Sequence, residues 1–257
     1  MVTPLQAVET SGIGILIGLL GGLFGKGGSA VATPLLSLIG LPGFVAVASP
    51  LPATIPGTLL AAWAYWRAGV MDWQVVRWGI AVGIPATAAG AWLSRMTGAT
   101  PLLIVTALLV LGFGLSFLLH PGEKQAEDES GPARRERPSW WRLRMIVIGI
   151  AVGLISGLLA NSGGFLLAPL YARFLNLRLK VAFACSLLIS AVLALPGTVV
   201  HWYLGHISWL VTLLIAVGSV PLSYAGARLA IHTNAQRLEK WYGLALTVLG
   251  VVFLLHH

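Results

Sequence analysis

Residues 18–35 read GLLGGLFGKGGSAVATPL, and residues 153–170 read GLISGLLANSGGFLLAPL, so the chain contains one pattern twice. At a shift of 135 positions the glycines and the proline of the two stretches align, for example Gly22 with Gly157. Farther along the chain the alignment resumes at a shift of 136. Repeats with apolar segments interrupted by Gly and Pro at corresponding positions are typical of secondary transporters, and they indicate where the substrate binds.

The composition excludes a soluble protein. Of 257 residues, 57% are hydrophobic and only 9% are charged, whereas a soluble domain carries about 25% charged residues. The apolar runs are continuous over roughly 20 residues and do not alternate, which favours membrane-spanning helices over a barrel. We therefore predict an all-α integral membrane protein. The net charge of +8 comes mainly from the connections and is better explained by membrane orientation than by nucleic-acid binding.

Each repeat is expected to contain five helical segments, and a charged linker joins the repeats. The first transmembrane repeat, residues 1–119, holds segments 8–25, 28–40, 44–66, 73–95 and 100–119; the linker is 120–142; and the second transmembrane repeat, 143–257, holds segments 143–160, 163–176, 180–204, 208–231 and 237–256. The linker contains five of the eight acidic residues together with Pro and Gly, which indicates a solvated segment.

The second segment of each repeat is too short to span a bilayer comfortably. About 13 residues rise roughly 20 Å as a helix, against a hydrocarbon core of about 30 Å. Either the first two segments form a broken or re-entrant hairpin that turns at the glycines, or both are short tilted crossings. Both alternatives contribute an even number of passes.

The cations indicate the orientation. If the first two segments of each repeat together make an even number of passes, nearly all the cations in the connections fall on one side of the membrane and Arg95 alone falls on the other. The cations on the first side are Arg67, Arg77, Lys124, Arg134, Arg135, Arg137, Arg142, Arg144, Arg173, Arg178, Lys180, Arg228, Arg237 and Lys240. The positive-inside rule then places the linker in the cytoplasm and both termini outside. Each repeat then makes an odd number of passes, so the second repeat begins on the opposite side of the membrane from the first. The two repeats are therefore expected to be inverted relative to each other.

Inversion is expected to bring the two Gly-rich turns together near the bilayer midplane, where helix N-termini and glycine backbone favour an anion. The predicted substrate-binding residues, four from each turn, are Gly25, Lys26, Gly27, Gly28, Asn161, Ser162, Gly163 and Gly164. Lys26 is a charge at membrane depth, and such a charge indicates a functional site. The alternatives are that Lys26 snorkels to a surface and that the glycines serve close helix packing.

Polar residues in the third segments form a second candidate set. The predicted pathway-lining residues are Ser49, Thr54, Ser186, Ser190 and His201. Nearby prolines must distort these helices, which is tolerated against protein or water; the alternative is a packing kink. His201 is either a hydrogen-bonded interface histidine or a proton carrier, so proton coupling stays open.

The sequence does not favour catalysis. All eight carboxylates lie at or outside the predicted segment ends, whereas a carboxylate proton relay needs one in the interior. The six histidines are scattered and there is one cysteine, so we expect no metal site, no cofactor and no enzyme activity.

The duplicated pattern resembles that of the sulfite exporter TauE/SafE family of bacterial membrane transporters. The resemblance covers nearly the whole chain outside the linker. It rests on the two Gly-rich turns, each followed about six residues later by a proline, and on the Gly-x-x-x-Trp turns at 69–73 and 205–209. This chain departs from the family pattern at Lys26, where an apolar residue is common, and at residues 160–162, where a Gly-rich triplet is common.

The resemblance implies a transporter of the bacterial cytoplasmic (inner) membrane that carries sulfite, thiosulfate or an organosulfonate such as sulfoacetate. Together with the predicted anion site, it leads us to expect a secondary transporter that works by alternating access. A passive anion channel and a non-transporting membrane assembly subunit are the alternatives. The expected partners are the small sulfur-containing anion and the lipid bilayer, with no nucleic acid.

Overall fold

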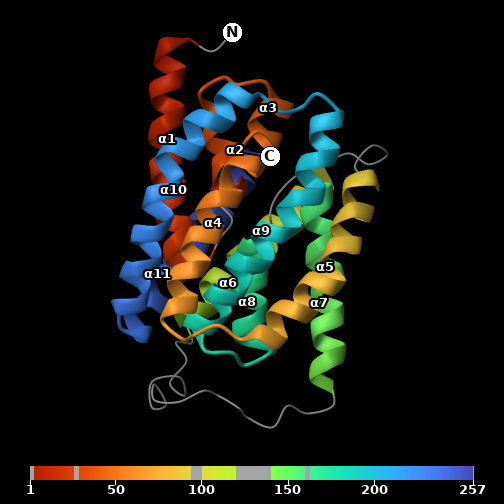
Figure 1. Ribbon diagram of the computed structural model, residues 1–257, viewed down its shortest axis with the longest axis vertical. Helices are drawn as coiled ribbons and strands as arrows, with labels where there is room; N and C mark the ends of the chain where they lie inside the picture. Colours follow the sequence, from red (N-terminus) through yellow and green to blue (C-terminus); the bar gives the residue numbers. More distant parts are fainter. Residues whose placement is uncertain (1–2, 26–28, 94–99, 120–139, 160–162, 257) are drawn as a thin grey trace.

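The computed structural model describes residues 3–25, 29–93, 100–119, 140–159 and 163–256. All secondary structure in these ranges is helical, which confirms the predicted all-α class (Figure 1). The helices are α1 (Pro4–Phe24), α2 (Ser29–Leu38), α3 (Gly43–Ala48), α4 (Pro50–Arg67), α5 (Trp73–Leu93), α6 (Thr100–Leu119), α7 (Trp140–Leu158), α8 (Gly164–Phe174), α9 (Leu179–Tyr203), α10 (Trp209–His232) and α11 (Ala235–His256).

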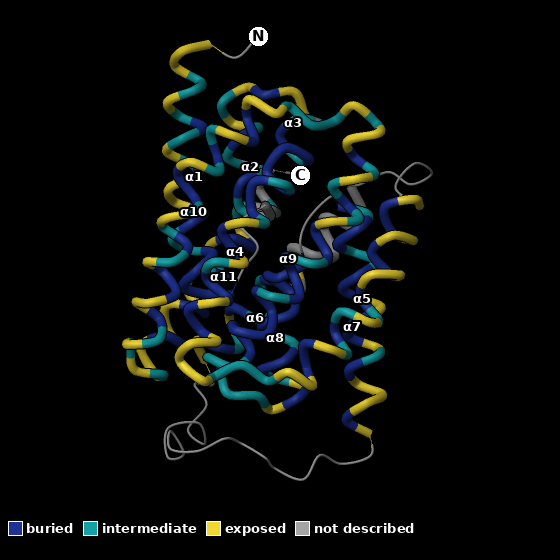
Figure 2. The backbone as a smooth tube through the Cα atoms, viewed as in Figure 1, coloured by how far each residue is buried: buried dark blue, intermediate teal, exposed yellow. Residues whose placement is uncertain are grey.

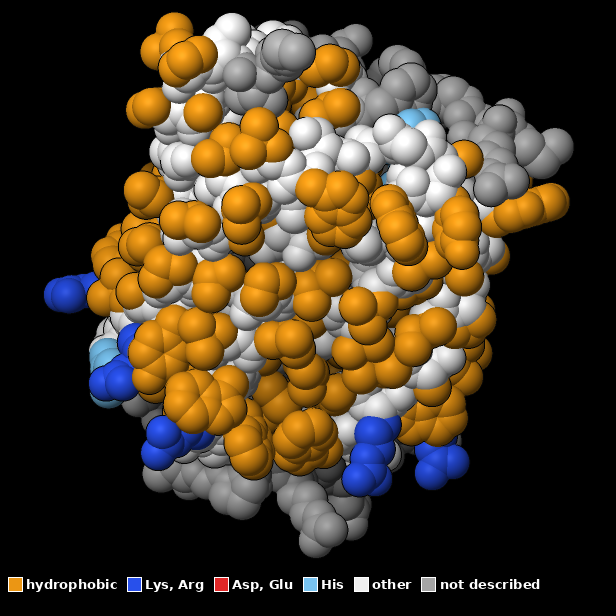
Figure 3. Space-filling view, turned by 45° about the horizontal axis from the view of Figure 1, so that its top comes forward, with side chains coloured by type: hydrophobic (Ala, Val, Ile, Leu, Met, Phe, Trp, Pro, Cys, Tyr) orange, Lys and Arg blue, Asp and Glu red, His pale blue; other side chains and the backbone are white. Residues whose placement is uncertain are grey.

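Five stretches of the described residues are long and apolar enough to cross a membrane. They are Pro4–Phe24, Val45–Arg67, Trp140–Leu158, Leu179–Tyr203 and Trp209–His232. The chain is therefore a multi-pass membrane protein. Figure 2 shows the buried residues on the inward faces of the helices and the exposed ones on the outward faces. On the face in Figure 3 the surface is mainly hydrophobic, and the Lys and Arg side chains gather toward one end.

The helix bounds differ from the expected ones at two instructive places. Helix α1 begins at Pro4, four residues early, because Thr3 caps it: the Thr3 side chain accepts from the Gln6 N–H, and the Gln6 side chain accepts from the Thr3 N–H. This is a capping box followed by a proline at the first helical position. Helix α7 also begins earlier than expected, at Trp140 instead of residue 143, inside the stretch assigned to the linker.

The segment expected as one helix over 44–66 consists of two. Helix α3 ends at Ala48 and α4 begins at Pro50, with Ser49 between them. The proline ring has no N–H to donate to the carbonyl four residues earlier. The break therefore follows from Pro50, and it fits the expected distortion of this segment.

The second helix of each repeat is short. Helix α2 has 10 residues and α8 has 11, which corresponds to about 15–17 Å along the axis. Neither can span a bilayer as a straight helix. Whether each forms a re-entrant hairpin with the helix before it stays a prediction.

The two repeats exchange partners. The first segment of each repeat packs along the fourth segment of the other, α1 on α10 and α7 on α5, while α4 packs against α9 and α6 against α11. In Figure 1, α1 and α7 begin at opposite ends of the molecule and run in opposite directions. The sequence duplication is thus matched by a duplication of the helix contacts.

Glycines make this exchange possible. The glycines of α1 that face α10 are Gly14, Gly18 and Gly22, and those of α7 that face α5 are Gly149, Gly153 and Gly157. A Cβ on Gly14 would lie 2.6 Å from the carbonyl oxygen of Ile215, and one on Gly153 would lie 2.7 Å from the Cβ of Ala86. Both distances are shorter than van der Waals contact, so the helices approach this closely only because the side chains are absent.

The contacts correspond position by position. Gly226 on α10 faces the carbonyl of Leu19 on α1, and Gly90 on α5 faces the carbonyl of Leu154 on α7. Gly226 and Gly90 align at the shift of 136, and Leu154 and Leu19 align at the shift of 135. The two shifts found in the sequence therefore describe equivalent helix pairs in the structure.

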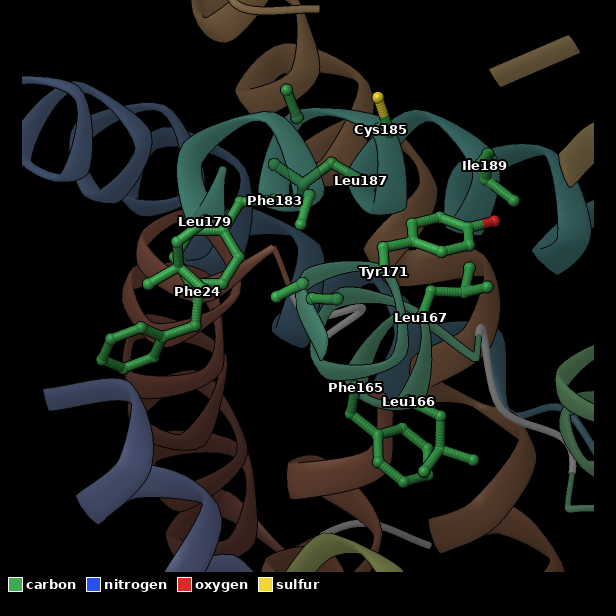
Figure 4. Packing of buried hydrophobic residues seen from close by; sticks show 14 of the residues in the cluster. Phe24, Phe165, Leu166, Leu167, Tyr171, Leu179, Phe183, Cys185, Leu187 and Ile189 are labelled. Carbon is green, nitrogen blue, oxygen red and sulfur yellow. The ribbon is translucent and has the colours of Figure 1, made fainter. Parts of the chain in front are cut away.

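An aromatic core joins the end of α1 to the second repeat. Figure 4 shows the Phe183 ring projecting from α9 toward Phe24 at the end of α1, while Tyr171 projects from α8 toward α9. The ring centroids of Phe24 and Phe183 lie 6.3 Å apart in an edge-to-face arrangement, a favoured geometry for aromatic pairs. This packing fixes the end of α1, where the first Gly-rich turn begins.

Candidate functional site

The first turn begins at Gly25, which ends α1 in a left-handed conformation with a φ of 64°. Only glycine adopts this conformation without strain. A Cβ at this position would lie 2.6 Å from the Cα of Phe183 and 2.6 Å from the Oγ of Ser186. Gly25 is thus required by both its backbone conformation and its contact with α9.

Ser186 joins the two sets of residues that the sequence singled out. Its Oγ lies 2.8 Å from the carbonyl oxygen of Gly25 and 3.0 Å from that of Phe183. The hydroxyl proton bridges an acceptor on its own helix and an acceptor at the end of α1. A predicted pathway residue of the second repeat is therefore in direct contact with a predicted turn residue of the first.

The second turn leads into α8 through Gly163, which has a φ of 69°. A Cβ on Gly163 would lie 3.0 Å from Val152 and 3.2 Å from Ser156, both on α7. Residues 163–169 are all buried. The first N–H groups of α8, those of Gly164 and Phe165, therefore lie in the interior, where a helix N-terminus without intrahelical acceptors carries partial positive charge.

The remaining five predicted turn residues lie outside the described residues: Lys26, Gly27, Gly28, Asn161 and Ser162. Their role in substrate binding stays a prediction. The described glycines beside them have different neighbours, since Gly25 packs on α9 and Gly163 packs on α7.

Thr54 and Ser190 are equivalent positions of the two repeats at the shift of 136, and both are buried. The Thr54 Oγ1 donates to the carbonyl of Leu51 over 2.9 Å, and Thr54 lines a small cavity between α1, α4 and α10. The Ser190 Oγ has no hydrogen-bond partner among the described residues. Both side chains thus place hydroxyl oxygens in the interior of the helix bundle.

Ser49 holds the break between α3 and α4 against the start of α10. Its Oγ accepts from the N–H of Ser208 over 2.9 Å, and its carbonyl oxygen accepts from the Oγ1 of Thr212 over 2.9 Å. In this arrangement the hydroxyl serves a contact between repeats, and a role in the pathway stays a prediction.

His201 has a partner that sequence reasoning missed. Its Nδ1 lies 3.2 Å from the Nδ1 of His206, beyond the end of α9. One Nδ1 must carry the hydrogen and donate it to the other, because two unprotonated nitrogens would repel each other at 3.2 Å. Burial lowers the pKa of His206 below its ordinary value. The signal in the sequence was Gly205, four residues after His201. In the structure Gly205 has a φ of 71°, and the turn there brings His206 back to His201.

Glu239 lies near the start of its helix, as expected, but it is buried. This residue is only 4% exposed, and its Oε1 lies 3.9 Å from the Nη2 of Arg173. The same Arg173 atom donates to the carbonyl of Ser116 over 2.9 Å, and the guanidinium lies over the ring of Phe117. Arg173 of α8 thus pairs with Glu239 and also contacts α6.

Comparison with known proteins agrees with this architecture. A family model described as Sulfite exporter TauE/SafE matches residues 11–253. The probable membrane transporter protein YunE of Bacillus subtilis is 24% identical, over 89% of this chain and 88% of the relative. Probable membrane transporter proteins of Xylella fastidiosa and Methanocaldococcus jannaschii are 26% and 24% identical, each over 95% of this chain and 93% of the relative. No solved structure matches the chain significantly.

Proposed function

Because this chain belongs to the sulfite exporter TauE/SafE family of membrane transporters, we propose that it is a secondary transporter for a small sulfur-containing oxyanion or organosulfonate. The substrate class comprises sulfite, thiosulfate and sulfoacetate. The protein moves this anion across the cytoplasmic membrane by alternating access, around one site that the two Gly-rich turns share.

The observation that carries the proposal is the buried start of α8. An 11-residue helix begins in the interior behind a left-handed glycine, and residues 163–169 are all buried. Buried N–H groups at a helix N-terminus favour an anionic ligand. The first repeat has the corresponding short helix, α2, after its own glycine-rich turn.

Each turn has a distinct task in this proposal. Lys26 supplies the positive charge, and the N–H groups of the turn glycines donate to the anion's oxygens. Asn161 and Ser162 discriminate among anions by hydrogen bonding, since charge-assisted contacts are strong and side-chain amides and hydroxyls are directional.

The exchange of helix partners supports alternating access. The first segment of each repeat packs on the fourth segment of the other, and α1 and α7 run in opposite directions (Figure 1). Repeats inverted in the membrane can exchange inward-open and outward-open states by rocking about a central site. The clustering of cations toward one end (Figure 3) favours a cytoplasmic linker and external termini.

Counterflow in proteoliposomes tests the function. Vesicles that contain the purified protein and are preloaded with unlabelled thiosulfate should take up labelled thiosulfate faster than empty vesicles, and the uptake should saturate. Sulfite and sulfoacetate should compete with the label, and sulfate serves as the comparison anion.

The alternatives give different results in the same assay. A passive channel gives flux that neither saturates nor accelerates with internal substrate. A non-transporting assembly subunit gives no protein-dependent flux of any of the three anions. Either result contradicts the proposal.

A further inference from the structure

A small cavity lies where α1 and α4 of the first repeat meet α10 of the second. Its volume is about 10 Å³, close to the roughly 10–15 Å³ that a single water-sized occupant needs. Four hydroxyl side chains line it together with two glycines and one isoleucine of α1: Thr54, Thr58, Ser219, Ser223, Gly18, Gly21 and Ile17. The cavity is polar on the sides formed by α4 and α10.

The hydroxyl protons of the two threonines that line the cavity are used within α4. The Oγ1 of Thr54 donates to the carbonyl of Leu51 over 2.9 Å. The Oγ1 of Thr58 lies 2.9 Å from the carbonyl oxygen of Thr54. A hydroxyl has one hydrogen, so both threonine protons are committed to α4 and the oxygens remain as acceptors.

Ser219 provides the independent sign of a ligand. Its side chain is 2% exposed, lines the cavity, and its Oγ has no hydrogen-bond partner among the described residues. A buried hydroxyl without a partner is unfavourable unless an occupant of the cavity satisfies it. Its neighbour Ser223 lies at the contact between α10 and α4, with its Oγ 2.8 Å from where a Cβ on Gly57 would be.

The charge environment favours a cation. Helix α1 ends at Phe24, so Gly21 lies in its last turn, where the helix dipole is negative. Gly21 itself lines the cavity. Lone pairs and the negative end of a helix thus meet at one cavity.

We propose that this cavity binds a single Na⁺ ion. Hydroxyl and carbonyl oxygens are ligands that hard cations prefer, and helix C-terminal ends coordinate Na⁺ in other transporters. The ligands come from α4 of the first repeat and α10 of the second, so occupancy links the two repeats. This inference goes beyond the anion site and does not depend on which anion is carried.

Thermal unfolding of the purified full-length protein in detergent tests the site. The midpoint is measured against NaCl, KCl and choline chloride at constant ionic strength. Since a ligand of the native state raises its stability, Na⁺ should raise the midpoint saturably, while the larger K⁺ and choline should not. Ser219→Ala and the isosteric Thr54→Val should each raise the half-saturating Na⁺ concentration roughly tenfold or more.

Thr247→Val on α11 is the matched control, because the Thr247 Oγ1 also donates to its own helix, to Gly243 over 2.9 Å. It should leave the half-saturating concentration unchanged. A midpoint that responds equally to all three cations would overturn the proposal and leave water as the occupant. An undiminished Na⁺ response in both variants would overturn it too. No anion is needed, so failure here is distinct from failure of the counterflow assay.

Discussion

The Oγ of Ser186 on α9 lies 2.8 Å from the carbonyl oxygen of Gly25 at the end of α1. This hydrogen bond connects residues 161 positions apart, and it ties Gly25, the start of the first Gly-rich turn, to α9, the third helix of the second repeat. The start of the first turn at Gly25 is therefore held by a helix of the opposite repeat.

Replacing Gly25 should be costly for two separable reasons. Gly25→Ala strains a left-handed residue, which costs about 1–2 kcal/mol, and it also places a Cβ 2.6 Å from the Cα of Phe183. Gly69→Ala is the control, since Gly69 has a φ of 73° but no atom near its Cβ position. Denaturant titration in detergent should show a clearly larger loss for Gly25→Ala. Equal losses would mean that the contact with α9 contributes nothing.

The exchanged helix pairs should be equally sensitive to added side chains. Gly22→Ala places a methyl group against the carbonyl of Ser223, and Gly157→Ala places one against the carbonyl of Thr87. Each should lower the free energy of unfolding by about 1–3 kcal/mol through overpacking. Gly12, on the same helix as Gly22, has open space around it, so Gly12→Ala should be neutral or stabilising by up to about 1 kcal/mol. The packing account fails if Gly12→Ala and Gly22→Ala behave alike.

The histidine pair predicts a loss of stability in acid. Burial lowers the pKa of His206 below 6.5 in the folded protein, so below that pH the unfolded chain binds more protons than the folded one. Stability is then unchanged above pH 6.5 and falls as the pH drops toward the folded-state pKa. Unfolding midpoints between pH 7.5 and 5.0 should decline less in His206→Asn than in the parent. In the control His232→Asn, at the exposed end of α10, the unfolding midpoint should fall with pH as steeply as in the parent. A parent midpoint that does not fall between pH 7.5 and 5.0 would contradict the lowered pKa of His206.

Much of the helix pattern could be predicted because apolar run length and glycine or proline interruptions are local properties of the sequence. The expected segment 100–119 coincides with α6, and the other long helices differ by a few residues at their ends. The division of the third segment at Ser49 follows from Pro50, since a proline removes a specific backbone donor.

Contacts between distant segments could not be predicted. Glycines four residues apart indicate a close helix contact, but nothing in Gly18 specifies α10 as the partner. Glu239 looked solvated because it lies near a helix start, and Arg173, which pairs with it, is distant in the sequence. His206 contacts His201 because Gly205 reverses the chain. Each of these outcomes depends on tertiary packing.

The central claim is that one anion binds both Gly-rich turns, and a double-mutant cycle in anion binding tests it most directly. Thiosulfate affinity is measured by titration calorimetry for the parent, Lys26→Met, Asn161→Ala and the double variant. Lys26→Met alone should weaken binding by about 1.5–3 kcal/mol, the value of a hydrogen bond to a charged group. Because groups that share one ligand are energetically coupled, the double variant should depart from additivity by about 0.5–3 kcal/mol. Additive losses would contradict a shared site, even for a protein that transports the anion.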